Sequence, residues 1–151
     1  MKIQQWLKDE EGGQALIEFA LTLPILLLVV TGTFDVARAV WEENTLAYAA
    51  REGTRYAIVH GSGGSPVVGP CSMCVDPTTD GLDNIVTVVN NAAVGVHGIV
   101  VTIDYPDLAN HRLDRVTVDA QAPFVPLPSQ YMLGSAFQIT LRGGSQLVIQ
   151  R

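Results

Sequence analysis

The fold of this chain is decided by the stretch Gly12-Gly13-Gln14-Ala15-Leu16-Ile17-Glu18-Phe19-Ala20-Leu21-Thr22-Leu23-Pro24, after which the sequence stays apolar to Phe34. From Ala15 to Phe34 there are about 20 residues, enough to cross a hydrocarbon core of roughly 30 Å as a helix. Glu18 carries the one charge in this segment. A lone carboxylate costs roughly 2.5–3.5 kcal/mol at the centre of a membrane helix, and less near an end. We therefore expect a transmembrane helix and treat Glu18 as a candidate functional residue.

Length and composition limit the class of protein. The chain has 151 residues and a net charge of −6, which is one domain's worth of sequence beyond a membrane segment. Without a basic stripe to meet phosphates, we expect no nucleic-acid partner. The sequence has no nucleophile elbow, no Gly-rich phosphate loop before a helix and no metal-ligand cluster. We expect no enzyme and, accordingly, no catalytic residue, no cofactor and no bound metal.

The first 13 residues form a short polar leader. A secretory signal is normally cut after its apolar core, whereas a cut here would lie before the core. The residues alone leave a second interpretation open, in which residues 1–13 are an unprocessed cytoplasmic tail on a signal anchor.

We expect the helix to continue beyond the membrane segment 14–34 through residues 35–59, giving roughly 70 Å of helix at 1.5 Å per residue. Pro24 is expected to be a tolerated kink. Asp35 and Arg38 are spaced to pair on one helix face, and Trp41 is expected near the outer interface. Small residues at helical spacing then predict a close approach to a sheet: Ala50, Gly53 and Ala57, preceded by Leu46.

Residues 60–81 are predicted to be a loop, because the segment begins with glycines and serines. The loop holds Cys71 and Cys74. No second CxxC is present and the histidines are isolated, so we expect neither a zinc site nor a thioredoxin-type motif. A structural disulfide is permitted if the loop is exported, and free thiols are the alternative. The nearby acidic residues miss the alternation of a calcium loop.

Residues 82–95 predict a short helix, because apolar side chains recur from Leu82 to Ala93 at helical spacing. Asp80 is a candidate cap and Gly95 a candidate stop. The β-branched content of this segment leaves a strand as the alternative.

The rest of the chain predicts strands. Residues 99–105 and 115–122 each alternate between apolar and polar side chains. A third alternating run passes through Gly143-Gly144 and is either a hairpin or one bent edge strand. Such alternation suits an antiparallel sheet with one solvated face. We expect an α+β fold in which the long helix packs on three or four strands, within a small α+β domain over residues 82–151.

The N-terminal stretch resembles a known family. Gly13 before Gln14, with Glu18 fifth counting from Gln14, is similar to the cleavage region of type IV prepilins and pseudopilins. The longer run from Gly13 to Pro24 resembles the TadE-like pseudopilins of tight-adherence (Tad/Flp) pilus systems. A second matching run is Ala49-Ala50-Arg51-Glu52-Gly53-Thr54-Arg55-Tyr56-Ala57.

The resemblance implies a function and a location. A membrane aspartyl prepilin peptidase would cut between Gly13 and Gln14, and the mature minor pseudopilin would help to build or prime a pilus used in surface adherence. Glu18 and Phe19 would act in assembly. The implied partners are the peptidase, other pilins or pseudopilins, Tad inner-membrane assembly proteins and membrane lipid. The implied location is the bacterial inner membrane, with a single span, a pilin-like fold and the C-terminal domain extracytoplasmic.

Two other classes remain open at the level of the sequence. One is an uncleaved single-pass membrane protein whose exported domain acts as a scaffold for pilus or secretion machinery. The other is a surface adhesion module that uses the helix as an anchor. Cleavage at Gly13 separates the first from a pseudopilin, and a partner bound by residues 60–151 alone would favour the second.

Overall fold

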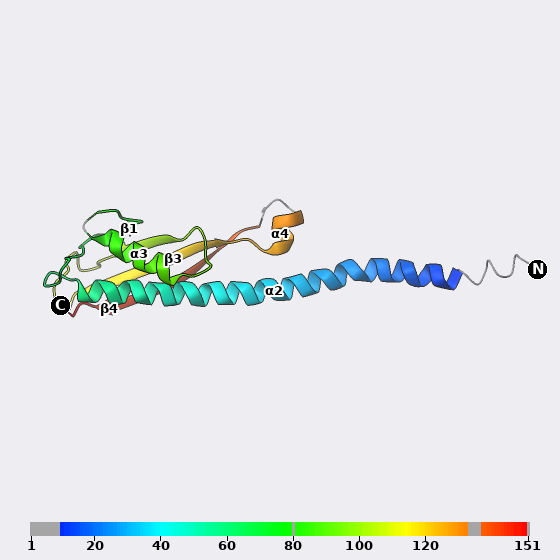
Figure 1. The fold of residues 1–151 in the computed structure, drawn as a ribbon, viewed down its shortest axis with the longest axis horizontal. Coiled ribbons are helices and arrows are strands. Elements are labelled where there is room, and N and C mark those ends of the chain that lie inside the picture. Colours follow the sequence, from blue (N-terminus) through cyan, green and yellow to red (C-terminus); the bar gives the residue numbers. More distant parts are fainter. Residues whose placement is uncertain (1–9, 80, 133–136, 151) are drawn as a thin grey trace, which may run out of the picture.

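The computed structural model of the chain describes residues 10–79, 81–132 and 137–150. One long helix lies along a four-stranded sheet and extends far beyond it (Figure 1). The elements in chain order are α2 (Glu10–Val59), β1 (Cys74–Val75), α3 (Leu82–Ala92), β2 (Val100–Asp104), β3 (Arg115–Phe124), α4 (Leu127–Met132) and β4 (Ile139–Val148). The expected α+β class is confirmed.

Helix α2 is continuous over 50 residues and passes through Pro24. It begins at Glu10, a turn before the expected start at Gln14, and it ends at Val59 as expected. Hydroxyl groups in its apolar half are satisfied within the helix: Thr31 donates to the carbonyl of Leu27 at 2.8 Å, and other threonines do likewise. This half therefore offers few unpaired polar groups to its surroundings.

The sheet is antiparallel throughout, with strand order β1-β2-β3-β4. β3 and β4 pair along their whole lengths, from Arg115 opposite Val148 to Phe124 opposite Ile139. The Gly143-Gly144 pair lies in the middle of this ladder, so of the two sequence interpretations the single edge strand is right. β1 was not predicted: its two residues lie in the expected loop and pair with Ile103 and Thr102 of β2.

One face of the sheet carries the hydrophobic core, covered by the outer half of α2 and by α3. The side chains of this core are fully or almost fully buried: Leu46, Ala49, Ala50, Ala57, Leu82, Ile85, Val89, Val101, Ile103, Val116, Val118, Ala120 and Ala122. Gly53 lies where α2, α3 and β3 meet, since a Cβ there would approach Val89 to 2.5 Å and Val118 to 3.3 Å. The predicted stripe of small residues on α2 is confirmed as the surface that packs on the sheet.

The opposite face of the sheet is polar. It presents the alternate residues of β3 and β4, among them Thr117, Asp119 and Arg142. Asp119 and Arg142 form an ion pair with a distance of 2.7 Å between Oδ2 and a guanidinium nitrogen. The sheet thus has the single solvated face that its alternation predicted.

Three local expectations turned out differently. Asp35 and Arg38 do not pair with each other in the structure; Arg38 pairs with Glu42, and Asp35 binds the chain before α4. Helix α3 is confirmed as a helix but ends at Ala92, before Gly95. Asp80, the expected cap, lies outside the described residues, and Gly81 is the N-cap residue with no side-chain hydrogen bond.

Candidate functional site

The predicted cleavage position, Gly13–Gln14, lies inside the first turns of α2. Both residues are helical and exposed, and a Cβ built on Gly13 would meet nothing within 4 Å. The peptide bond is therefore accessible, but it is not extended. Glycine weakens a helix by roughly 0.5–1 kcal/mol relative to alanine, and two successive glycines, Gly12 and Gly13, favour local unwinding at this point.

Glu18 and Phe19 lie one turn further along α2 and are both exposed; Phe19 is 60% exposed. Gln14 and Glu18 are four residues apart, so they share one face of the helix. Within the described part of the chain, Glu18 has no ion-pair partner. A charged group on an apolar helix with no partner in its own subunit is a candidate for contact with another molecule.

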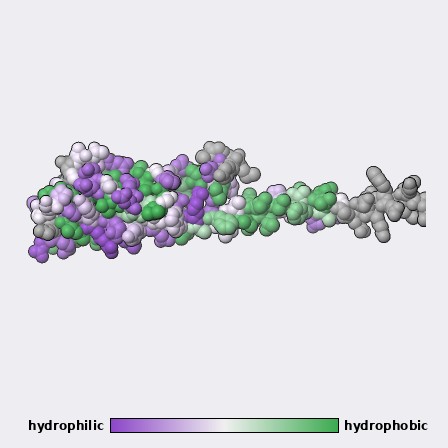
Figure 2. Space-filling view, viewed as in Figure 1, coloured by the Kyte–Doolittle hydropathy of each residue, from purple (hydrophilic) through white to green (hydrophobic). Residues whose placement is uncertain are grey.

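The N-terminal half of α2 packs against almost nothing in its own chain. No residue from 13 to 34 is buried, and from residue 13 onwards Asp35 is the first buried residue of the helix. Figure 2 shows this half as a narrow hydrophobic rod that leaves the mixed surface of the sheet domain. Among the described residues, α2 is the one helix long and apolar enough to cross a membrane. This indicates a single-pass membrane protein.

A polar clamp, formed by Asp35 and Arg38, ties α2 to the chain between β3 and α4. The backbone N–H of Leu127 donates to Asp35 Oδ2 at 2.9 Å, and the Arg38 guanidinium donates to the carbonyl of Val125. Arg38 also lies over the ring of Phe124, 4.4 Å from its centroid, where a cation–π attraction adds to the contact. The clamp lies where the free half of α2 ends and the half that packs on the sheet begins.

The sequence does not reveal this clamp. The spacing of Asp35 and Arg38 predicts a charged pair on one helix face and does not point to the chain before α4. Their partners are backbone groups about 90 positions away, and a backbone donor or acceptor leaves no signature in the residue type.

The loop that holds the two cysteines is pinned to the edge of β2. The structure joins Cys71 to Cys74 by a disulfide. Around it, the N–H of Tyr105 donates to the Cys71 carbonyl at 2.9 Å, and the N–H of Met73 donates to Asp104 Oδ1 at 3.0 Å. The formation of the disulfide in the cell stays a prediction.

The end of the sheet domain away from the apolar half of α2 holds the ion pair Asp107–Arg115. Asp107 accepts from the side chain of Arg115 at 2.8 Å and from its backbone N–H at 2.9 Å. These hydrogen bonds lower the pKa of Asp107 to about 2, and the same bond raises the pKa of Arg115. The pair closes the loop before β3. Among the described residues no group of three or more His, Cys, Asp or Glu side chains could hold a metal ion.

The fold and the helix together define a class. A long apolar helix whose outer half packs on an antiparallel sheet, while its inner half stays free, is consistent with a pilin-like protein.

The family comparison then narrows this class. The family model described as TadE-like protein matches residues 13–55, which confirms the resemblance to TadE-like proteins over that segment. The matched segment covers the predicted cleavage position, the apolar half of α2 and most of its packing half, and it stops before the sheet. The match indicates a protein associated with the Tad pilus and with its other components. No curated protein and no solved structure matches the chain.

Proposed function

We propose that this chain is a minor pseudopilin of a Tad/Flp type IV-like pilus. In this proposal a prepilin peptidase cuts between Gly13 and Gln14, and the mature subunit takes part in pilus assembly and thereby in surface adherence. The observation that carries the proposal is the division of α2 into a free apolar half, with Gly13 and Glu18 near its start, and a half packed on the sheet. The family match covers the free half and most of the packed half.

Processing gives the free half of α2 a new charge at its start. Cleavage would turn the amide nitrogen of Gln14 into an ammonium group, one turn from Glu18. The two opposite charges can then be neutralised together, either within one helix or between neighbouring subunits, which removes much of the cost of a lone carboxylate in lipid. In this proposal the sheet domain lies outside the inner membrane and the leader lies in the cytoplasm.

The helical conformation of Gly13–Gln14 favours one alternative, an uncleaved single-pass protein with an exported scaffold or adhesion domain. A protease that binds extended backbone would first have to unwind the start of α2. In the pseudopilin proposal the glycine pair lowers the cost of this unwinding, whereas in the alternative the helix stays whole.

The N-terminal mass of the protein separates the two. The full chain is co-expressed with its cognate prepilin peptidase, isolated from membranes and analysed by intact-mass spectrometry, with an inactive peptidase as control. We expect a chain that begins at Gln14 with the active enzyme alone. Gly13→Leu should block the cut by placing a bulky side chain at the scissile position. A chain that keeps Met1 beside active peptidase contradicts the pseudopilin assignment.

A further inference from the structure

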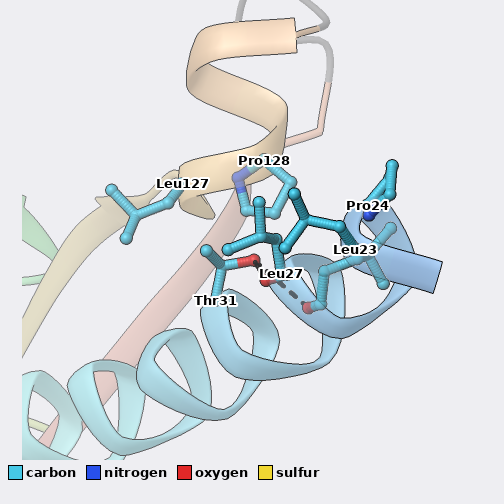
Figure 3. A pocket seen from close by; sticks show the side chains of 7 residues that line it. Leu23, Pro24, Leu27, Thr31, Leu127 and Pro128 are labelled. Carbon is cyan, nitrogen blue, oxygen red and sulfur yellow. Dashed lines mark hydrogen bonds between the residues drawn. The ribbon is translucent and has the colours of Figure 1, made fainter. Parts of the chain in front are cut away.

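Helix α4 lies beside the part of α2 that is expected to cross the membrane (Figure 1). Between the two helices is a groove of about 500 Å³, and Figure 3 shows Pro128 of α4 facing Leu27 of α2 across it. The groove is lined by Leu23, Pro24, Leu27, Leu28, Thr31, Leu127 and Pro128. All the α2 residues in this wall fall within the expected span 14–34. Part of the sheet domain therefore lies beside residues of the expected transmembrane span.

The wall of the groove offers nothing polar to a ligand. Thr31 carries the one polar side chain among the lining residues, and its hydroxyl already donates to the carbonyl of Leu27 at 2.8 Å. The volume falls in the range of cavities that hold small ligands, roughly 300–1,000 Å³. A groove of this size with an apolar wall suits a hydrocarbon chain rather than a polar molecule.

Three backbone groups of the connection to α4 are paired within the protein, as lipid requires of them. In hydrocarbon, every backbone donor and acceptor needs a partner within the protein. The polar clamp, Asp35 and Arg38, satisfies the N–H of Leu127 and the carbonyl of Val125. In water these groups would need no charged side chain to pair with them.

The prolines of the connection reduce the number of backbone groups that need a partner. Pro126 and Pro128 have no N–H to satisfy, and the carbonyl of Pro126 accepts from the N–H of Gln130 at 2.9 Å. A segment with two prolines and paired neighbouring groups can enter an apolar phase without leaving these donors and acceptors bare. The groove and the backbone pairing are independent observations, and both indicate that α4 lies in an apolar environment.

We propose that α4 is seated in the leaflet next to the sheet domain and that the groove holds a phospholipid acyl chain. The inference goes beyond the pseudopilin role and depends only on membrane insertion of α2. A second copy of the chain is the competing occupant. The acyl chain is favoured because a single inserted subunit already exposes the groove to hydrocarbon, before any assembly.

The test uses a photoreactive residue as a probe of what touches α4. The full chain, with Pro128 replaced by benzoylphenylalanine, is reconstituted in vesicles of phosphatidylethanolamine and phosphatidylglycerol, irradiated and analysed by mass. Leu127 is replaced in a second variant, which serves if the loss of the proline harms folding. Two control positions carry the same probe: Leu21, exposed on the apolar half of α2, and Val148, at the far end of β4.

We expect lipid adducts at Pro128 and Leu21, in several-fold higher yield than at Val148. Adducts at Leu21 but only the Val148 level at both α4 positions would overturn the inference while leaving membrane insertion of α2 intact. A covalent dimer formed through Pro128 would mean that a second copy fills the groove, which also overturns it. Absence of adducts at Leu21 would show that α2 is not inserted in the membrane, which also overturns the inference. Since none of these outcomes depends on cleavage at Gly13, the proposed function is tested separately.

Discussion

Gly143 of β4 lies directly against the backbone of Ala47 in α2, so closely that a Cβ at position 143 would overlap the helix backbone. The contact is the closest approach between helix and sheet among the described glycines. It accounts for Gly143, in the middle of an uninterrupted strand. The neighbouring Gly144 faces the other side of the sheet, where its nearest neighbour is the carboxylate of Asp119.

The two glycines therefore predict opposite results for the same substitution. Gly143→Ala forces two backbones apart and should destabilise the protein by roughly 1–3 kcal/mol, as overpacking of a core does. Gly144→Ala should be nearly neutral, because the Asp119 side chain can turn away and alanine suits a strand better than glycine. Thermal unfolding of both variants of the full chain, followed by circular dichroism in detergent, measures the difference. Equal losses would mean that the contact with Ala47 is not what selects glycine at 143.

This contact also shows why part of the fold was hidden in the sequence. A Gly-Gly pair between alternating strands is a common hairpin signal, and local rules cannot tell it from a strand that must pass close to a helix. The choice is made by a residue almost 100 positions away. By contrast, the length of α2 and the small residues Ala50, Gly53 and Ala57 were readable, because helical periodicity is a local property.

Other features of the fold that the sequence did not predict also depend on contacts between residues far apart in the chain. The two-residue β1 gives too short a pattern to be recognised, and it forms because the loop is tied to β2 by hydrogen bonds. The expected pairing of Asp35 with Arg38 was wrong because backbone partners before α4 compete for both side chains. At the candidate site, the positions of Gly13 and Glu18 on an exposed apolar helix were predictable, but the clamp and the groove beside α4 were not.

The pair Asp107–Arg115 predicts a stability that depends on pH. The pKa of Asp107 falls from 3.8 to about 2 on folding, chiefly through the side-chain hydrogen bond from Arg115. A carboxyl group with a lowered folded pKa stabilises the protein above its unfolded pKa, and this contribution is lost as the pH falls from about 4 towards 2. Asp107→Asn should therefore lower the melting temperature at neutral pH and change it less near pH 2.

The matched control is Glu43→Gln, at an exposed carboxylate of α2 that forms no ion pair among the described residues. Melting temperatures of wild type and both variants are measured from pH 7 down to pH 2. The difference between wild type and Asp107→Asn should shrink below pH 4, whereas the Glu43→Gln curve should stay parallel to wild type. A constant offset for Asp107→Asn would contradict the assigned pKa shift.

The cysteine loop predicts a disulfide of modest energetic importance. If the loop is exported, Cys71 and Cys74 should resist alkylation until a reductant is added. Replacing both by serine should lower stability only a little, because the closed loop is short and its backbone is also held by bonds to Tyr105 and Asp104. Membrane insertion should not change. Full alkylation of the native, unreduced protein would show free thiols instead.

The last prediction concerns Glu18 and tests assembly rather than insertion. An unpaired carboxylate in lipid costs a few kcal/mol, so replacement by an apolar residue should insert at least as well. Insertion therefore gives no reason for a carboxylate at position 18, whereas a partner would. The proposed partner is the ammonium of Gln14, in the same helix or in a neighbouring subunit. In the structure Glu18 is exposed and, within the described residues, has no ion pair, so its carboxylate is free to meet either.

We predict that Glu18→Ala leaves expression, insertion and cleavage at Gly13 largely intact but impairs pilus assembly. Glu18→Gln should share the defect if charge, rather than hydrogen bonding, is required. Leu16→Ala is the matched control, since Leu16 is 70% exposed in the same part of α2 and its loss removes apolar bulk without removing charge. Piliation is counted by electron microscopy and compared with the amount of mature protein in the membrane. Normal piliation of the Glu18→Ala strain at wild-type protein level would mean that Glu18 only extends its carboxylate to the membrane surface, as a charged side chain near a helix end can do without a partner.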